Sequence, residues 1–247
     1  MIGETGSGKS SIYNAFATAL EDSTLIKKTY KTAPIRNGES VTRKINLAPL
    51  YFRGRMLPIR FYDMPGICEE NCVRQNELEM ILNGELKQGL EVARASEMRK
   101  MTTFIRPNPT PADKIHCILY VMRATSNFST KLSTSFNEMK KIQDSRKNDD
   151  EVQQFVIITA IDEIGVPNEE MAYAYQYHCV QNIRDKVVDA LKILPSQVIP
   201  VSNYFVETFA CEAKNAMSLL ALWQVCKPAE EYLKLKSPGK DLADFYG

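Results

Sequence analysis

Eight residues near the start of the chain constrain its fold more than any other segment. Residues 3–10 read GETGSGKS and match G-x-x-x-x-G-K-[ST] at every fixed position. The glycines permit a tight curl that turns successive N–H groups towards one anion, and the helix that follows directs its positive end to the same point. The motif therefore predicts a phosphate-binding loop, with a glycine-rich helix cap as the alternative.

Each residue of this loop has an expected role. Lys9 would reach the β- and γ-phosphates, and the hydroxyl of Ser10 would bind Mg²⁺. The expected phosphate-binding residues are Gly3, Glu4, Thr5, Gly6, Ser7, Gly8, Lys9 and Ser10.

A second metal-binding group is expected where the segment RFYDMPG leaves a strand-like run. Asp63 would hold Mg²⁺, through water, and the amide of Gly66 would contact the γ-phosphate. The pattern D-x-x-G alone occurs at the end of many strands. Here it follows the phosphate loop after one helix and a hairpin, which strengthens the assignment. A closing loop should add a threonine ligand, for which Thr42 is preferred to Thr32. An ordinary surface threonine is the competing interpretation.

The run FVIITAID indicates how a base would be recognised. Guanine is commonly bound by [NT]-K-x-D, in which the Asp accepts hydrogen bonds from the base and the Lys covers its face. Thr159 and Asp162 fit this pattern, but Ala160 replaces the lysine, so we expect weaker or less selective guanine binding. Asp162 as a simple helix cap is the alternative. The backbone amide of Ser202 or Asn203 is expected near the base oxygen.

Hydrolysis is expected to be slow. Many GTPases position the attacking water with a Gln directly after D-x-x-G, and Ile67 occupies that position. The sequence therefore assigns no catalytic residue. A partner chain would have to supply one.

The remaining sequence predicts an α/β fold of the P-loop NTPase type. Short β-rich runs such as IHCILYVM alternate with helical patterns, which favours a mostly parallel sheet with helices on both faces. P-loops normally follow a central strand, but only Met1 and Ile2 precede Gly3. We expect that strand to be missing or a stub, because the sequence is a fragment or a mis-started gene model, or because the sheet has a central gap.

The predicted organisation is one nucleotide-binding domain over residues 1–236, followed by a frayed tail over 237–247. A helical insertion at about 69–105 is the expected surface for a protein partner or a second copy. The last helix is expected to end or kink at Pro228 and to pack Trp223 into the core.

Composition excludes several other classes of protein. Lys plus Arg (31) nearly balance Asp plus Glu (30), so a nucleic-acid partner is not expected. No apolar stretch is long enough for a membrane span, and no signal peptide is evident. The six scattered cysteines read as free thiols, and a cytoplasmic location is expected.

Several motifs together resemble the interferon-induced protein 44 family. They are GETGSGKSS, SVTRKI, YDMPG, ILNGELKQG, ADKIHCILYVM and PVSNYF, and they extend from Gly3 to about Leu233. The resemblance implies a cytosolic G-domain protein, distantly similar to dynamins and septins, that binds GTP or GDP and serves an innate immune or antiviral response. The chain departs from that pattern in its first strand and at Ala160.

Three functions remain open from the sequence. The first is a Mg²⁺-dependent guanine-nucleotide switch or slow GTPase. The second is a scaffold or adaptor that keeps the fold while its nucleotide site decays. The third is an ATP-binding variant, which Ala160 permits.

Overall fold

Four parallel strands form the centre of the computed structural model, which describes residues 1–21, 23–29, 45–64, 66, 75–87, 104–126, 137, 140–142 and 152–236. The strands lie in the order β1-β4-β5-β6, with bounds β1 Ile2–Gly3, β4 Cys117–Arg123, β5 Gln153–Thr159 and β6 Val198–Pro200. The predicted α/β fold with a mostly parallel sheet is confirmed.

The register of the sheet explains why its strands are apolar. Ile2 pairs with Tyr120, Tyr120 pairs with Val156, and Val156 pairs with Val198. All four side chains are at most 5% exposed. Strands covered on both faces need apolar residues at successive positions, which is the pattern that the sequence has here.

An antiparallel hairpin, β2 (Asn46–Phe52) and β3 (Arg55–Asp63), forms a separate two-stranded sheet. Gly54, in its turn, adopts a φ of +76°, a conformation that glycine reaches without strain. The base of the hairpin joins the core, because the ring of Phe61 lies 5.6 Å from that of Phe16 on α1 (Lys9–Glu21). This packing brings the end of β3 beside the start of α1.

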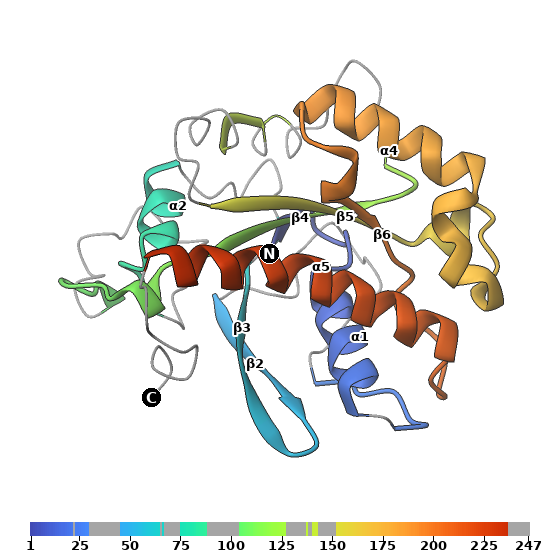
Figure 1. Ribbon diagram of the computed structural model, residues 1–247, viewed down its shortest axis with the longest axis horizontal. Helices are drawn as coiled ribbons and strands as arrows, with labels where there is room; N and C mark the ends of the chain where they lie inside the picture. Colours follow the sequence, from blue (N-terminus) through green and yellow to red (C-terminus); the bar gives the residue numbers. More distant parts are fainter. Residues whose placement is uncertain are drawn as a thin grey trace.

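Helices lie on both sides of the parallel strands (Figure 1). Helices α1 and α5 pack together on one side, and α4 lies on the other. The bounds are α2 Gln75–Leu82, α4 His178–Leu191 and α5 Glu212–Lys236, with 3-10 helices η2 Pro111–Asp113, η3 Ile161–Ile164, η4 Asn168–Gln176 and η5 Pro195–Gln197.

The expected end of the last helix at Pro228 and the expected burial of Trp223 were wrong. The helix continues through Pro228 to Lys236. Leu222 and Val225 before the proline and Leu233 after it are all buried, so packing holds both halves in one helix. Trp223 is 61% exposed, on the opposite face of the helix from this apolar stripe. None of the helices in the described part of the chain is long and apolar enough to cross a membrane.

The strand before the phosphate loop is a stub of two residues, Ile2–Gly3, in this structure. Within the predicted insertion at 69–105, the structure describes residues 75–87, which include α2, and residues 104–105, and a bridge joins Leu86 to Ile105. The predicted tail at 237–247 lies outside the described residues.

Candidate functional site

The loop between β1 and α1 curls back on itself. The amide of Ser7 donates to the carbonyl of Glu4 at 3.1 Å, and Gly6 and Gly8 adopt φ values of +79° and +98°. A Cβ at Gly3 would lie 2.2 Å from the carbonyl oxygen of Val121 on β4. The pattern of glycines therefore matches the positive φ values and the close approach to β4 that this backbone requires.

Lys9 lies over this loop and is only 6% exposed. Its Nζ donates to the carbonyls of Gly3 at 3.0 Å and Glu4 at 2.9 Å. Burial lowers the pKa of Lys9 to about 8, and the carboxylates of Asp63 and Glu4 partly offset this effect. The ammonium group therefore lies desolvated within the loop, where an anion would be a strong partner.

Ser10 and Asp63 meet at the beginning of α1. The hydroxyl of Ser10 donates to Oδ2 of Asp63 at 2.8 Å, and the Asp63 side chain is fully buried. Oδ1 of Asp63 has no hydrogen-bond partner among the described residues. A buried carboxylate oxygen without a partner is energetically costly, which indicates a site that a ligand completes.

Gly66 lies directly against the loop. A Cβ at Gly66 would lie 2.5 Å from Oγ1 of Thr5 and 2.6 Å from its Cα. Within the described part of the chain, Oγ1 of Thr5 and Oγ of Ser7 are also buried without partners. Asp63 and Gly66 thus both lie against the loop, and the two orphan hydroxyls lie in the same loop.

Two side chains from distant parts of the chain donate hydrogen bonds to backbone carbonyls of the loop. Thr159, at the end of β5, donates its hydroxyl to the carbonyl of Ser7 at 2.6 Å. Asn203, after β6, donates its side-chain amide to the carbonyl of Gly8 at 3.3 Å. Sequence reasoning assigned both residues to base binding, but in this structure their side chains contact the phosphate loop.

Asp162 and Ser202 come together from two different loops. The hydroxyl of Ser202 donates to Oδ1 of Asp162 at 2.7 Å, and Asp162 is otherwise exposed at the start of η3. Ala160, the residue in the place of the expected lysine, adopts the left-handed conformation with φ +57°. Asp162 makes no side-chain cap to η3, so the alternative role as a helix cap is not observed.

A buried lysine that sequence reasoning missed supports the loop after β6. Lys214 on α5 is 2% exposed and donates to Oε1 of Glu207 at 2.6 Å and to the carbonyl of Asn203 at 3.2 Å. Lys214 thereby stabilises the backbone of Asn203, whose side chain contacts Gly8. Because Lys214 is distant in sequence from every motif, only the tertiary packing reveals it.

Other sequence predictions fall outside this site or outside the described residues. Thr42 and Ile67 belong to segments that the structure does not describe. His116, just before β4, hydrogen-bonds the carbonyl of Pro111 through Nε2 at 2.8 Å. The described residues contain no cluster of three or more His, Cys, Asp and Glu side chains. A metal at this site would therefore depend on Asp63, Ser10 and the oxygens of a ligand.

The donors present fit a magnesium–phosphate group. Ser10 and Asp63 supply the hard oxygen ligands that Mg²⁺ prefers, and Oδ1 of Asp63 is buried with no partner from the part of the chain that the structure describes. Lys9 and the loop amides are suited to phosphate oxygens. Bound Mg²⁺ would neutralise charge on the phosphates.

The comparisons with known proteins agree with this geometry. Residues 1–160 match the family model described as 50S ribosome-binding GTPase. The chain is also 23% identical over 242 residues to mouse (Mus musculus) interferon-induced protein 44. That alignment covers 95% of this chain but only 55% of the relative, so the chain spans about half the length of the curated protein it matches. With a family model covering residues 1–160 and the loop, Asp63 and Gly66 assembled at one edge of the sheet, the chain belongs to the 50S ribosome-binding GTPase family.

Proposed function

We propose that this chain binds GTP and GDP with Mg²⁺ and acts as a switch or slow GTPase. The proposal rests on the buried polar atoms around the loop, on Thr5, Ser7 and Asp63, which have no hydrogen-bond partner among the described residues. Burying these polar atoms is unfavourable unless a ligand forms hydrogen bonds or a metal contact with them. A magnesium-bound triphosphate would offer oxygen acceptors for the hydroxyls and a cation for the carboxylate.

Each residue of the site has a proposed role. Residues 3–10 and Gly66 bind the phosphates, with Lys9 moving from the carbonyls of Gly3 and Glu4 to the β- and γ-phosphates. Ser10, Asp63 and Thr42 are the proposed metal ligands. Exchange of GTP for GDP would change the contacts at Gly66 and Thr42 and thereby alter a surface that a partner binds.

Base selectivity is proposed to depend on Asp162. Its carboxylate would accept hydrogen bonds from guanine N–H groups, and the hydroxyl of Ser202, which donates to Oδ1 at 2.7 Å, would orient it. The backbone amide of Ser202 or Asn203 remains the proposed donor to the base oxygen. With Ala160 in place of a lysine, one face of the base stays uncovered, so we expect only moderate preference for guanine over adenine.

The biological setting is proposed from the relative alone. Because the similar mouse protein is named as interferon-induced, we propose a role in an innate immune or antiviral response, in the cytoplasm. The proposed protein interface remains residues 69–105, with a second copy as one candidate partner.

A scaffold with a decayed nucleotide site is the second candidate function. Nζ of Lys9 already donates hydrogen bonds to two carbonyl oxygens of the loop, so this cation is partly satisfied without a ligand. Ala160 separately removes one contact to the base. This candidate predicts that nucleotides bind weakly or not at all.

Isothermal titration calorimetry with GTP, GDP and ATP, with Mg²⁺ and with EDTA, separates these functions. Micromolar binding of GTP and GDP that weakens with EDTA supports the switch, and absence of heat with all three nucleotides supports the scaffold. Tight binding of ATP without GTP would contradict the guanine assignment. In the Asp162→Asn variant, the affinity ratio of GTP to ATP should fall about tenfold, since at least one hydrogen bond to the base is lost.

A further inference from the structure

The loop between β6 and α5 supplies two side chains to the candidate site. Ser202 donates its hydroxyl to Asp162, and Asn203 donates its side-chain amide to the carbonyl of Gly8 at 3.3 Å. In the described part of the chain, residues 203–207 make no hydrogen bond from backbone to backbone. The position of Asn203 therefore depends on side chains of the elements around it.

Asn203 lies directly on the phosphate loop. A Cβ at Gly8 would lie 2.7 Å from Nδ2 of Asn203. Oδ1 of Asn203 is buried and has no hydrogen-bond partner among the described residues. Its backbone N–H has no acceptor in the same part of the chain, whereas the N–H of Val201 donates to the carbonyl of Ile158 at 2.8 Å. Asn203 thus keeps polar groups that a ligand could satisfy.

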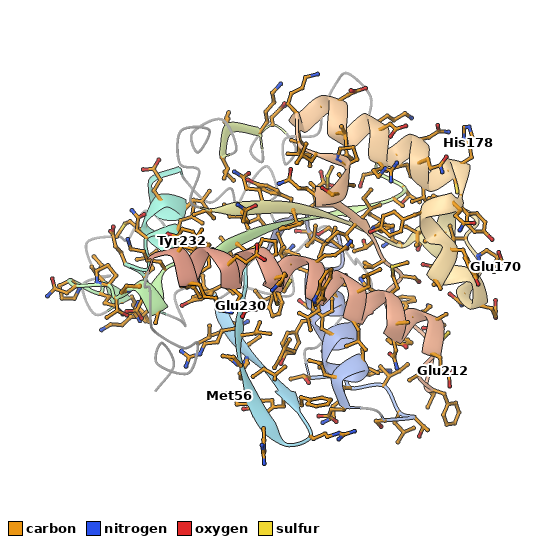
Figure 2. All side chains as sticks on the ribbon, in the orientation of Figure 1. Met56, Glu170, His178, Glu212, Glu230 and Tyr232 are labelled. Atoms are coloured by element: carbon orange, nitrogen blue, oxygen red, sulfur yellow. The ribbon has the colours of Figure 1, made fainter. Side chains whose placement is uncertain are left out.

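Lys214, on the first turn of α5, is the side chain that holds Asn203. It is only 2% exposed, and its Nζ donates to the carbonyl oxygen of Asn203 at 3.2 Å and to Oε1 of Glu207 at 2.6 Å. The same Nζ lies 5.5 Å from the centre of the Tyr204 ring. Figure 2 labels Glu212, two residues earlier, at the beginning of α5. These contacts of the ammonium group all belong to the loop after β6.

Glu207 completes the arrangement around the ammonium group. Its Oε2 accepts from the backbone amides of Phe205 at 2.7 Å and Val206 at 3.1 Å. Partial burial raises the pKa of Glu207, but the hydrogen bonds from Lys214 and from the amide of Phe205 outweigh this effect and leave the pKa below its ordinary value of 4.5. The carboxylate is therefore charged and ties the loop amides to Lys214.

Tyr204 adds a second attachment of the loop to α5. Its hydroxyl donates to Oδ1 of Asn215 at 2.8 Å and accepts from the amide of Cys211 at 2.9 Å. The ring is 7% exposed. Residues 203–207 are thus fixed to the beginning of α5 by a buried cation and a buried phenol, and α5 determines where Asn203 lies.

The candidate site has few groups that can discriminate between bases. The proposed function assigns the N–H groups of guanine to Asp162 and the base oxygen to the backbone amide of Ser202 or Asn203, while Ala160 has no side chain long enough to cover the base. A hydrogen-bond donor discriminates best when it is held in a fixed position, because a mobile donor can turn away from an unsuitable base. Whatever fixes Asn203 therefore contributes to the choice of base.

We propose that Lys214 is a positioning residue for base recognition: it holds Asn203 so that the backbone amide of this residue donates to the 6-oxo group of guanine. Lys214 itself does not touch the nucleotide. The site accordingly selects nucleotides of 6-oxo purines, which are guanine and hypoxanthine, over those of adenine. This inference rests on the proposed binding of GTP.

The first test compares GTP with 2-aminopurine riboside triphosphate, each with Mg²⁺. The analogue keeps the 2-amino group and the three phosphates but lacks the 6-oxo group and the N1 proton that accompanies it. Lys214→Met keeps an apolar stem and removes the charge, and the ratio of GTP affinity to analogue affinity should fall about fivefold to tenfold. Calorimetry measures both affinities.

The matched control is Lys227→Met on the same helix. Lys227 is 47% exposed and pairs with Glu231 one turn later, so its substitution should leave the affinity ratio unchanged. Loss of GTP and analogue affinity by the same factor in Lys214→Met would overturn the proposal, because a lysine that only stabilises the fold affects both nucleotides alike.

Hydrogen exchange tests the positioning without a nucleotide. The amides of Phe205 and Val206 donate to Glu207, so they should exchange at least about fivefold faster in Lys214→Met than in Lys227→Met. Equal exchange in the two variants would overturn the positioning role.

Glu207→Gln gives a milder perturbation that decides the question even if Lys214→Met does not fold. It keeps Lys214 but removes the charge that binds it, and the ratio of GTP to analogue affinity should fall about twofold to threefold. An unchanged ratio would overturn the proposal.

Failure of this inference can be told apart from failure of the proposed function. If the unsubstituted chain binds none of the nucleotides, the proposed GTP binding is wrong, and the base contact is wrong with it. If the unsubstituted chain prefers GTP and Lys214→Met keeps that preference, only the role of Lys214 is wrong.

Discussion

The two ends of β1, β3 and β4 are held together in different ways. At the end where the strands finish, three separate segments meet: Ser10 bonds Asp63, Gly66 lies on Thr5, and Thr159 bonds Ser7. At the opposite end, β3 and β4 are separated by a cavity of about 650 Å³, next to the bond between Met1 and Tyr62. The candidate site is therefore assembled at one end of β3 and β4, two strands that do not pair with each other in the described part of the chain.

The two ends differ because different kinds of interaction stabilise them. The phosphate loop is stabilised by contacts within a few residues and by hydrogen bonds to its carbonyls, which short polar side chains supply. Closing the sheet needs a continuous run of backbone donors and acceptors between two strands. A two-residue β1 supplies such a run only at Tyr120 and Val121.

The largest expected effect concerns the phosphate end. Lys9→Ala removes the cation at the centre of the loop, and we expect the affinity for Mg²⁺–GTP to fall at least about a hundredfold, or roughly 3 kcal/mol. The fold should persist, because the substitution also removes a buried charge. Calorimetry measures the affinity, and circular dichroism checks the fold. Lys186→Ala, on the exposed face of α4, is the control; unchanged affinity in Lys9→Ala would remove the loop from the proposed site.

Gly66→Ala tests the contact that joins β3 to the loop. The new Cβ would lie within 2.6 Å of the Thr5 backbone, so the segment has to shift, at a cost of about 1–3 kcal/mol in the free energy of unfolding. Nucleotide affinity should fall as well. Gly54→Ala at the far turn of the hairpin is the matched control, because nothing lies within 4 Å of its Cβ and only its positive φ is strained. Equal nucleotide affinity in the two variants would show that Gly66 does not contribute to binding.

The smallest expected effect separates the base end from the phosphate end. Ser202→Ala removes the hydrogen bond to Asp162 without touching the phosphate loop. We expect GTP affinity to fall about threefold to tenfold, or about 1 kcal/mol, with little change in ATP affinity. Competition binding with the two nucleotides measures both. An equal loss for GTP and ATP would mean that Ser202 acts on the loop rather than on base recognition.

Much of the candidate site follows from local patterns. The spacing of Gly3, Gly8 and Lys9 fixes the loop and the beginning of α1, and a strand-like run ending in Asp63 predicts the second group. These patterns can be read because the turn and the helix start depend on neighbouring residues. The strands β4 and β5 could be predicted for the same reason, because each is a run of neighbouring apolar residues.

Other features depended on contacts between segments far apart in sequence. That Asn203 bonds Gly8, that Lys214 is buried beside Glu207, and that Trp223 is exposed could not be read from their surroundings in the chain. Each depends on how α5 and the loop after β6 pack against the loop and the sheet. Local propensity also allowed the helix to end at Pro228, whereas packing on both sides of the proline keeps α5 continuous.

The phosphate loop, the alternation of strands and helices, and the residue types at the candidate site can be predicted from the amino-acid sequence, because they depend on short-range geometry and hydrophobic periodicity. Which polar atoms of the described residues are buried without partners, and where β3 and β4 stay apart, depends on the tertiary structure. Burial and strand pairing arise from contacts across the whole chain, and no local pattern of residues specifies them.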